Sequence, residues 1–206
     1  MRVYYYIEVS YPASLFWCRG VDELVKVDLP ARLRFDFPTA IVVVSCSADK
    51  KDKPNLMTVG AVSHACSDPP MLGIAIGHMR YTHQIISRSD GFVVNVPSKN
   101  QVEIVDYVGS VSGREIDKFK VCNLTLLPST RISSPGILEF PLNIECATRK
   151  SINLGSHSFY FGEIMAVHCD KSILDNDGSI NKEKLQPMST FLDSYWTLGE
   201  QVQKFS

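Results

Sequence analysis

Short runs of aliphatic and β-branched residues alternate along the chain with clusters of turn-forming residues. The run TAIVVVSCSA (39–48) is typical of a buried strand, because β-branched side chains suit the pleated backbone. Two later runs contain a residue that interrupts regular pairing: Gly60 indicates a bulge or a close approach, and Pro141 indicates an edge or a bulge. The sequence predicts strands at 39–48, 56–65, 71–77, 91–97, 122–128, 138–154 and 158–170.

Two segments between the predicted strands have helical character. Residues 81–89 contain two isoleucines and neither proline nor glycine, which predicts a short helix. In residues 100–110, valines recur at every third position, which predicts an amphipathic helix that ends at Gly109. Polar turns are predicted at 49–55, 67–70 and 174–185, and the tail at 189–202 is either a short helix or an extended cap.

Strands dominate this pattern, and most of them follow one another through turns. Seven or eight strands in such an order fit a closed or partly closed antiparallel barrel better than a doubly wound parallel sheet. No internal repeat or low-complexity linker divides the chain. We therefore expect one mainly β domain over residues 29–206, preceded by an aromatic-rich N-terminal extension of unknown role over residues 1–28.

Composition is that of an ordinary globular protein, with 45% hydrophobic and 21% charged residues. A formal net charge of −1 argues against duplex nucleic acid as a partner. The six cysteines form no CxxC pair, which favours a reducing, cytoplasmic setting. No stretch has the roughly 18 uninterrupted apolar residues of a membrane span, so no membrane partner is expected.

Several motifs of enzymes and metal sites are absent or incomplete in the sequence. DNDG (175–178) resembles part of a calcium loop, but in that register the last ligand position falls on Lys184, so the segment is interpreted as a turn. The five histidines form no HExxH, and no metal site is predicted. Neither GxGxxG, GxSxG nor a Walker A sequence occurs, so any nicotinamide nucleotide would bind outside a Rossmann crevice.

The stretch MRYTHQII (79–86) combines an arginine, an aromatic residue and a threonine just before the first predicted helix. If the helix begins at Tyr81 or Thr82, the free N–H groups of its first turn face outward, and Arg80 and the Thr82 hydroxyl add donors. A phosphate fits such a position. The alternative is an ordinary helix cap by Thr82, with Arg80 in solvent.

Two further stretches are compatible with a flat ligand. NLMTVGAVSHACSDPP (55–70) has small and polar residues where a packed strand is expected, so that a planar molecule can lie against its backbone. GSHSFYFGEI (155–164) places His157 at the start of a strand. The alternatives are a loosely patterned edge strand for the first stretch and a surface hairpin histidine for the second.

Six short pieces, in one order, resemble the flavin reductase-like family, the FMN-binding split barrels that include flavoredoxin. They are PNLMTVGAVSHACSDPPMLGIAI, RYTHQII, GFVVNVP, VGSVSGREIDKF, IECATRK and GSHSFYFGEI, and the resemblance covers roughly residues 28 to 200. It implies a split β-barrel of the antiparallel, Greek-key type with a few short helices. It also implies a homodimer with FMN bound near the subunit interface.

Carried over to the matching positions, the resemblance implies a cofactor site built largely from backbone groups. Arg80, Tyr81 and Thr82 would seat the FMN phosphate, and His157 would contact nicotinamide or the flavin ring. The other implied contacts are Ser45, Cys46 and Ser47 near the ring, Asn55, Leu56, Met57, Thr58 and Val59 along the ring and ribityl chain, and Ser63, His64, Ala65 and Cys66 along the ribityl phosphate.

The favoured hypothesis is an oxidoreductase in which NAD(P)H, as co-substrate, passes hydride to flavin. The electrons continue to free flavin, a ferric complex or a redox partner protein. No side chain is expected to act as catalytic acid or base, because the cofactor carries the chemistry. The alternative is a flavoredoxin-like electron carrier that holds FMN tightly and does not use NAD(P)H. A third class is a barrel that binds another ligand, such as haem, and has lost flavin.

Overall fold

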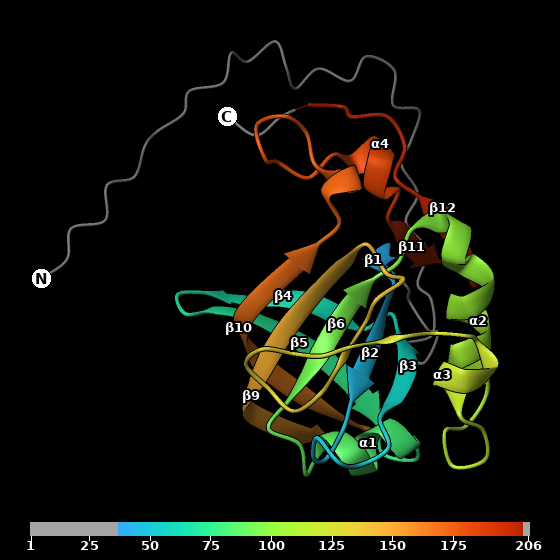
Figure 1. The fold of residues 1–206 in the computed structure, drawn as a ribbon, viewed down its shortest axis with the longest axis vertical. Coiled ribbons are helices and arrows are strands. Elements are labelled where there is room, and N and C mark those ends of the chain that lie inside the picture. The colour runs from blue at the N-terminus through green and yellow to red at the C-terminus, as the bar shows by residue number, and fades with distance from the viewer. Residues whose placement is uncertain (1–36, 204–206) are drawn as a thin grey trace, which may run out of the picture. The chain divides into compact units, whose positions relative to one another are not determined.

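The computed structural model describes residues 37–203 (Figure 1). The predicted N-terminal extension, residues 1–28, lies outside them, so the division into an extension and a domain stays a prediction. Within the described residues, no helix is long and apolar enough to cross a bilayer.

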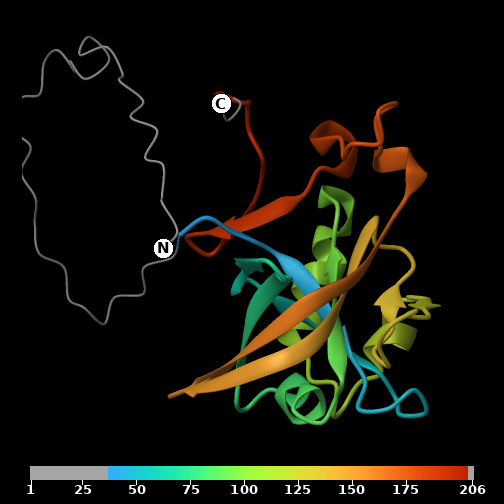
Figure 2. The same cartoon turned by 90° about the vertical axis from the view of Figure 1, so that its left-hand side faces the viewer.

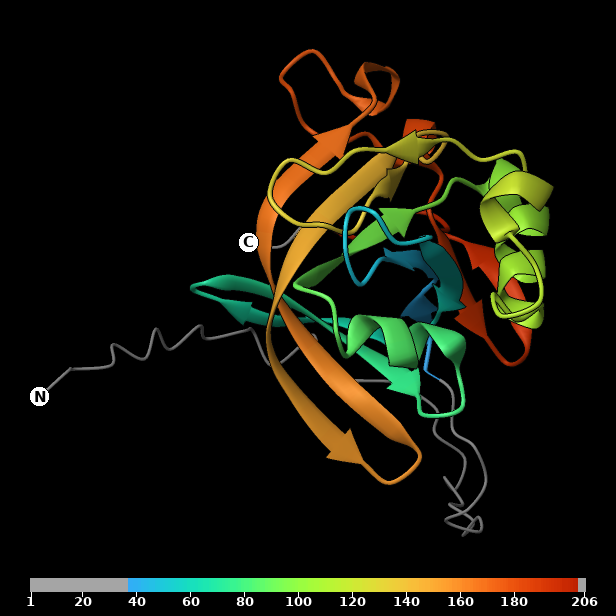
Figure 3. The same ribbon diagram turned by 60° about the horizontal axis from the view of Figure 1, so that its bottom comes forward.

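A seven-stranded antiparallel sheet forms the body of the fold (Figures 1 and 3). The sheet curls so that β3 also contacts β5, which partly closes a barrel. The expectation of a mainly β antiparallel barrel is therefore confirmed. In sheet order the strands are β3 (Asn55–Val59), β2 (Val42–Cys46), β6 (Gly91–Val96), β9 (Leu142–Leu154), β10 (His157–Cys169), β5 (Pro70–Gly77) and β4 (Val62–Ser67).

Shorter elements cover the ends and one side of this sheet. The helix α1 (Tyr81–Ile86) lies across one end of the barrel, and α2 (Val102–Ser110) and α3 (Lys118–Val121) lie along one side (Figure 1). At the other end, β1 (Thr39–Ala40), β11 (Met188–Phe191) and β12 (Ser194–Thr197) form a small sheet, near α4 (Lys182–Leu185). The remaining elements are β7 (Leu126–Leu127), β8 (Gly136–Ile137) and the 3₁₀ turns η2 (Lys99–Gln101) and η3 (Lys171–Ile173).

The strand β2 is buried on both faces, which explains why its sequence is an uninterrupted apolar run. Successive side chains of a strand point to opposite faces. Val42, Val44 and Cys46 belong to the core inside the barrel, together with Ile74 and Phe92. Ile41 and Val43 belong to a second core under α2 and α3. The two cores share β2 as their common wall.

The prediction of one continuous strand over residues 56–65 is wrong, because β3 and β4 divide this segment. The chain leaves β3 at one edge of the sheet and enters β4 at the opposite edge, so consecutive strands lie far apart in the strand order. The crossing is held by a hydrogen bond from Ala75 N to Ala61 O of 2.9 Å. A methyl group on Gly60 would lie 3.1 Å from Thr190 Cγ2, so the predicted close approach occurs at the crossing.

Three other predicted boundaries differ from the structure. The strand predicted at 122–128 is only the two-residue β7, because α3 occupies the preceding turn, with Asp117 as its cap. Gly109 lies inside the last turn of α2. A methyl group on Gly109 would lie 3.1 Å from Thr58 Cβ, so the absence of a side chain leaves room for Thr58. The strand predicted at 138–154 begins at Leu142, directly after Pro141, which has no N–H to donate.

The C-terminal segment follows the extended alternative rather than the helical one. The strands β11 and β12 form a hairpin whose turn residues Leu192 and Asp193 both have positive φ. The polar turn predicted at 174–185 ends in α4, a single helical turn. In this segment the Lys184 ammonium lies 3.1 Å from Asp175 Oδ1, so a lysine side chain forms an ion pair with the acidic loop at 175–178.

A buried carboxylate fixes the segment 128–135, which wraps across the sheet without regular structure. Glu145 on β9 is 1% exposed. It accepts hydrogen bonds from Thr130 N (2.8 Å), Arg131 N (2.8 Å) and His168 Nε2 (2.7 Å). Burial by itself would raise the pKa of Glu145, but these hydrogen bonds outweigh burial and hold the pKa below its usual value.

We expect Glu145→Gln to lower the free energy of unfolding at pH 7 by about 1.5–3 kcal/mol, the range for hydrogen bonds to a charged group. A depressed carboxyl pKa stabilises the fold above the unfolded-state pKa of about 4.3, and this contribution is lost as the pH falls through the folded-state pKa. The variant should lose that part of the acid sensitivity. Urea titrations between pH 3 and 7 measure both effects.

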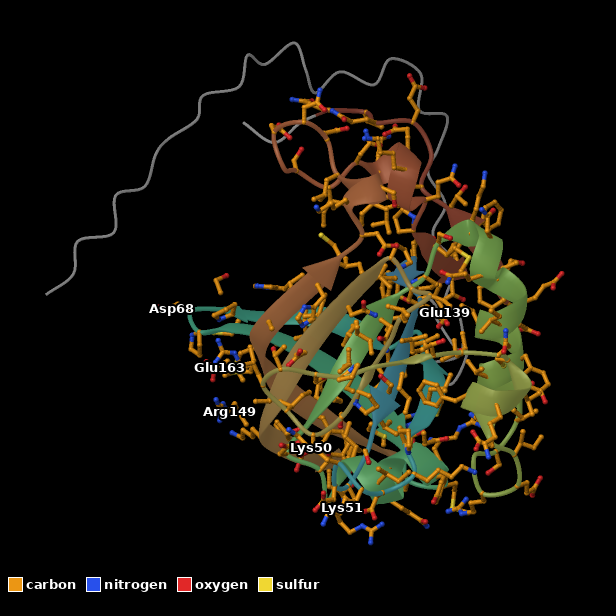
Figure 4. The ribbon with its side chains drawn as sticks, in the orientation of Figure 1. Lys50, Lys51, Asp68, Glu139, Arg149 and Glu163 are labelled. Atoms are coloured by element: carbon orange, nitrogen blue, oxygen red, sulfur yellow. The ribbon has the colours of Figure 1, made fainter. Side chains whose placement is uncertain are left out.

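The matched control is Glu139→Gln, which alters an exposed carboxylate that accepts from Thr125 N in a neighbouring segment (Figure 4). It should change stability much less than Glu145→Gln. Equal losses in the two variants would contradict the special role of the buried carboxylate.

Candidate functional site

The segment that connects β5 to α1 forms one wall of a cavity. The helix begins at Tyr81, as predicted, and Arg80 is its cap residue with an extended backbone and no side-chain cap. Thr82 therefore lies within the first turn and does not cap the helix. Its buried hydroxyl accepts a hydrogen bond of 2.8 Å from Asn55 Nδ2 on β3. This bond ties the helix start to the strand.

The cavity has a volume of about 310 Å³ and lies between β3, the start of α1 and the segment 110–118. Its lining contains three cationic side chains, Arg80, Arg114 and Lys118, and one carboxylate, Glu115. The helix α1 has only six residues, so its dipole is small, and the positive potential comes chiefly from these side chains. The cavity therefore favours an anion.

Lys118 is the most unusual of the three cations because it is 4% exposed. Its ammonium donates to Leu56 O (2.9 Å) and Val108 O (2.6 Å). An ammonium has three donors, so one more N–H remains for a ligand in the cavity that Lys118 lines. Burial, with a smaller contribution from the charge of Arg80, lowers the pKa of Lys118 to about 8. An anion in the cavity would raise the pKa of Lys118 again, because it would stabilise the charged ammonium.

Gly113 and Arg114 bring the segment 110–115 against the helix start. A methyl group on Gly113 would overlap Asn55 Oδ1 and lie 3.1 Å from the Tyr81 ring, so this close approach depends on the absence of a side chain at Gly113. The Arg114 guanidinium lies over the Tyr81 ring, 5.3 Å from its centroid, which is a cation–π geometry. Tyr81 thus positions a cationic side chain at the cavity.

The residues predicted on β3 divide between the two faces of the strand. Asn55 and Met57 line the cavity. Leu56 belongs to the core under α2, and the Thr58 hydroxyl donates to Val105 O of α2. Val59 belongs to the barrel core. Only the backbone of Leu56 and Thr58 is left for the ligand contacts predicted for them.

The predicted residues at the end of β2 have buried side chains that bond within the protein. Ser45 Oγ donates to Pro135 O (2.6 Å) and accepts from Asn95 Nδ2 (2.9 Å). Burial raises the pKa of the Cys46 thiol to about 12, so this thiol stays protonated. Ser47 N donates to Ser134 Oγ (3.0 Å). Their approach to a flavin ring stays a prediction.

The predicted residues of β4 do not reach the cavity within this chain. Ser63, His64 and Ala65 are exposed on an edge strand, and Cys66 is partly exposed. They pair with β5 at Met71 to Gly73, whereas the cavity lies beyond the opposite end of β5 at Gly77. The structure therefore separates Ser63–Cys66 from Arg80, Tyr81 and Thr82.

His157, the first residue of β10, is exposed and lies beside the cavity wall. It pairs with Gly77, and a methyl group there would lie 3.5 Å from His157 Nε2 and 3.7 Å from Arg80 Cγ. Its Nδ1 is 2.8 Å from the Ser156 hydroxyl. The histidine thus lies next to Arg80, with its ring held by the preceding residue.

Two further histidines meet behind the helix start. His78 Nε2 and His83 Nε2 lie 3.1 and 3.0 Å from the same Ser158 hydroxyl. Burial, followed by the nearby His78, lowers the pKa of His83. Within residues 37–203 no group of three or more potential metal ligands is present, so we interpret this cluster as a brace for α1.

Sequence reasoning missed the contribution of residues 110–118 to the cavity. The run SGREIDKF (112–119) contains two cations, but charged residues are usually solvated, and nothing local indicates that Lys118 is buried. The signal in the sequence that could have indicated burial is that Lys118 lies between two nearby apolar residues, Ile116 and Phe119, shortly after Gly113.

The fold and the cavity together define a split-barrel protein with a positively charged pocket at one end of the barrel. Residues 33–187 match the flavin reductase like domain. Because this match covers most of the chain, the protein belongs to the flavin reductase-like family, as its sequence motifs predict.

Solved structures and sequence relatives are similar to this chain over most of its length. Flavoredoxin of Desulfovibrio vulgaris (Miyazaki F) is 31% identical with a TM-score of 0.80, covering 87% of this chain and 97% of its own. Flavoredoxin from Methanosarcina acetivorans is 29% identical with a TM-score of 0.79, covering 89% and 95%. An NADH-dependent FAD reductase of Streptomyces globisporus is 25% identical over 158 residues, or 76% of this chain and 81% of its own.

We expect the affinity of the cavity for a phosphate monoester to fall as the pH rises above about 8. Below that pH the Lys118 ammonium is charged and attracts the anion; above it the group loses its proton. A phosphate monoester is already a dianion above pH 7, so its own titration does not interfere. The decline should approach tenfold per pH unit and be absent in Lys118→Met, measured by calorimetry with phenyl phosphate.

Lys120→Met is the control, because Lys120 lies on the same helical turn but is exposed. It should keep the pH dependence of the wild-type protein. An affinity that does not change between pH 7 and 9.5 in the wild type would contradict a role for Lys118.

A second expectation concerns the close approach at Gly113. Gly113→Ala should reduce phosphate affinity at least tenfold, because the added methyl group must displace the Asn55 side chain and so disturb its bond to Thr82. Gly155→Ala is unsuitable as a control because Gly155 has positive φ, whereas Gly199 has nothing within 4 Å of its missing side chain. Gly199→Ala should leave the phosphate affinity unchanged. A phosphate affinity of Gly113→Ala equal to that of the wild type would refute the role of the close approach at Gly113.

Proposed function

We propose that this protein is an FMN-binding oxidoreductase that accepts hydride from NAD(P)H and passes electrons to an acceptor. The observation that carries the proposal is the cavity at the end of the barrel, where three cations face one carboxylate. Its donors are of the kind that bind phosphate: two guanidinium groups with fork geometry and one buried ammonium. The family supplies the nature of the ligand, because its members are flavin reductases and flavoredoxins.

The side chains around the cavity hold and orient the nucleotide. Arg80 and Arg114 bind the phosphate from the solvent side, and Lys118 donates from the buried side. The Thr82 hydroxyl accepts from Asn55, so its own proton is free to be donated to the phosphate. These groups fix one end of the cofactor and leave its planar end to the strand.

Residues of β3 and of the end of β2 would hold the planar end of FMN. Met57 offers a flexible apolar surface, and Asn55 adds an amide at the same face. The bound flavin supplies the redox chemistry, taking up hydride and releasing electrons. The protein orients the two reacting rings and tunes the flavin potential through backbone N–H groups of Asn55–Val59, because β3 is an edge strand of the sheet.

The use of NAD(P)H as hydride donor is the more specific part of the proposal. His157 is exposed beside Arg80, where a nicotinamide that approaches a flavin from solvent would pass. We assign His157 the contact with nicotinamide and no proton transfer. The acceptor of the electrons is free flavin, a ferric complex or a redox partner protein, and the similarity to an NADH-dependent FAD reductase supports the first of these.

A second candidate function is an electron carrier that retains FMN and does not use NAD(P)H. The observation that favours it is the greater similarity to two flavoredoxin structures, at 31% and 29% identity with TM-scores of 0.80 and 0.79, than to the structure of the Streptomyces globisporus NADH:FAD oxidoreductase, at 18% and 0.66. Both functions need the same phosphate contacts. They differ in whether nicotinamide reduces the bound flavin.

We also propose that the protein is a homodimer with FMN near the subunit interface. Exposed apolar side chains on β9 and β10, namely Ile152, Leu154, Met165 and Val167, support an interface on these strands. Figure 2 shows the two strands as one long twisted ribbon. The exposed edge strand β4, with Ser63–Cys66, adds a further surface for a partner subunit. Light scattering of the purified protein tests this, and a monomer would contradict it.

A cytoplasmic location is part of the same proposal. The five cysteines within the described residues are all free, which suits a reducing compartment. Two of them, Cys46 and Cys146, are fully buried and have thiol pKa values raised to about 12 by burial, so they do not act as exposed redox thiols.

We expect Arg80→Ala combined with Thr82→Ala to weaken FMN binding while the fold is kept. Each change removes a charge-assisted bond, which is worth about 1.5–3 kcal/mol, or roughly 10- to 100-fold in Kd. Fluorescence titration with FMN measures the loss, and circular dichroism checks the fold. Riboflavin, which lacks the phosphate, should bind wild type and variant equally.

Two variants serve as controls for this experiment. Thr82→Ser keeps the hydroxyl and should bind FMN normally, and Arg88→Ala removes an exposed arginine just beyond the other end of α1. Unchanged FMN affinity in the Arg80/Thr82 double variant would show that the phosphate binds elsewhere.

The decisive test of the reaction is anaerobic addition of NADH or NADPH to the FMN-loaded protein. Rapid loss of the flavin absorption band is expected for the oxidoreductase. No bleaching by either nucleotide, with normal reduction by dithionite, would favour the electron carrier. Purified protein without flavin that also fails to bind added FMN would refute both functions.

A further inference from the structure

A second cavity of about 310 Å³ lies between the loop that joins β2 to β3 and the segment 126–135. It shares no lining residue with the cavity at α1. Its size is at the lower end of the range for small-molecule sites. Apart from Ser47, which the family resemblance places near the flavin ring, no residue of its lining has a role in the function proposed above.

The walls of this second cavity are largely apolar and stiff. Pro54, Pro128 and Pro135 contribute proline rings, and Leu126 and Ile132 fill the space between them. Proline rings present flat faces and lose little conformational freedom on binding, because their backbone φ is fixed. Such walls suit a small ring more than a flexible chain.

The protein anchors one of these walls with several polar groups. Residues 128–135 have no regular structure, yet Glu145 holds Thr130 and Arg131, and the Asp90 carboxylate accepts from Ser133 N at 3.0 Å. Ser134 Oγ donates to Gly91 O at 2.6 Å. A wall fixed in this way is formed before a ligand arrives, which reduces the entropy lost on binding.

The hydroxyl groups at this cavity are already committed as donors. Ser47 Oγ donates to Asp49 O (2.5 Å), Ser129 Oγ to Ser134 O (2.5 Å) and Ser133 Oγ to Asp90 Oδ2 (3.1 Å). A hydroxyl has one proton and two lone pairs, so these oxygens still accept but no longer donate. A ligand that meets them must bring its own O–H or N–H.

The charge at the rim completes the requirements. Two side chains of opposite charge, Lys50 and Asp52, line the cavity, and among residues 37–203 neither takes part in any of the ion pairs. Lys51, the neighbour of Lys50, does not line the cavity, although the two lysines lie together at the end of the barrel near α1 (Figure 4). An anionic group on the ligand would pair with Lys50, and the Asp52 carboxylate is a further acceptor for the O–H of the ligand, while the apolar part enters between the prolines.

We propose that this cavity binds a small hydroxylated aromatic acid. The ring packs against the proline and aliphatic walls, the hydroxyl donates to a serine oxygen, and the acid group pairs with Lys50. The site is separate from the FMN cavity, so this proposal stands whether or not the cofactor assignment is correct.

The test is calorimetry on the full chain saturated with FMN, with 3- and 4-hydroxybenzoate as probes. At least one of them should bind. The corresponding methoxybenzoate, which has no proton to donate, should bind at least tenfold more weakly because a buried acceptor is left unpaired. The matching hydroxybenzyl alcohol, which has no charge, should bind about fivefold more weakly, the size of an exposed ion pair.

Three variants place the binding in this cavity. Lys50→Gln should weaken the hydroxybenzoate about fivefold, and the control Lys51→Gln should not. Leu126→Trp, at a side chain that is 44% exposed, should block the cavity without disturbing the core. Absence of binding at millimolar concentration, displacement of the probe by FMN, or equal binding to the wild type, Lys50→Gln and Leu126→Trp would each overturn the proposal.

Discussion

The alternation of side chains along β2 and β3 is the constraint on which the rest of the structure depends. Because the period of a strand is two residues, one face of this pair packs inside the barrel and the other packs under α2 and α3. Asn55 and Met57 reach the cavity only because Leu56 and Thr58 point to the helix. A shift of one residue in β3 would exchange the two sets and remove the site.

The cavity itself is built around a buried charge. Removing an ammonium from water is unfavourable, and this is why the pKa of Lys118 is lowered to about 8. Two backbone carbonyls compensate part of that loss, one from β3 and one from α2. An anionic ligand would compensate more, because its charge would lie next to the buried ammonium. This is the electrostatic argument for a phosphate at this position.

The two cavities are linked by shared elements of the fold. The loop between β2 and β3 ends at Pro54, which lines the second cavity, and Asn55, which lines the first. The segment 128–135 is attached to the sheet through Glu145 and to the end of β2 through Ser134. Both cavities therefore depend on the strand pair, although no side chain belongs to both.

Local pattern was enough for several elements and misleading for others. The apolar runs of β2 and β6 and the start of α1 at Tyr81 follow from side-chain type and spacing. The break at Gly60 does not, because the residues on both sides keep strand character and only the crossing between sheet edges divides them. Lys118 has the sequence of a surface residue, and its burial follows from the packing of α2, α3 and β3.

The sequence by itself determined the antiparallel barrel and the family, and it predicted an anion site from Arg80 to Thr82, because each rests on patterns that can be recognised locally along the chain. The tertiary structure decided which of the implied residues come together. It joined Asn55, Arg80 and Lys118 around one cavity and left Ser63–Cys66 on a separate edge. Sequence patterns cannot supply that information, because contacts between distant segments arise only when the sheet curls and its two cores pack.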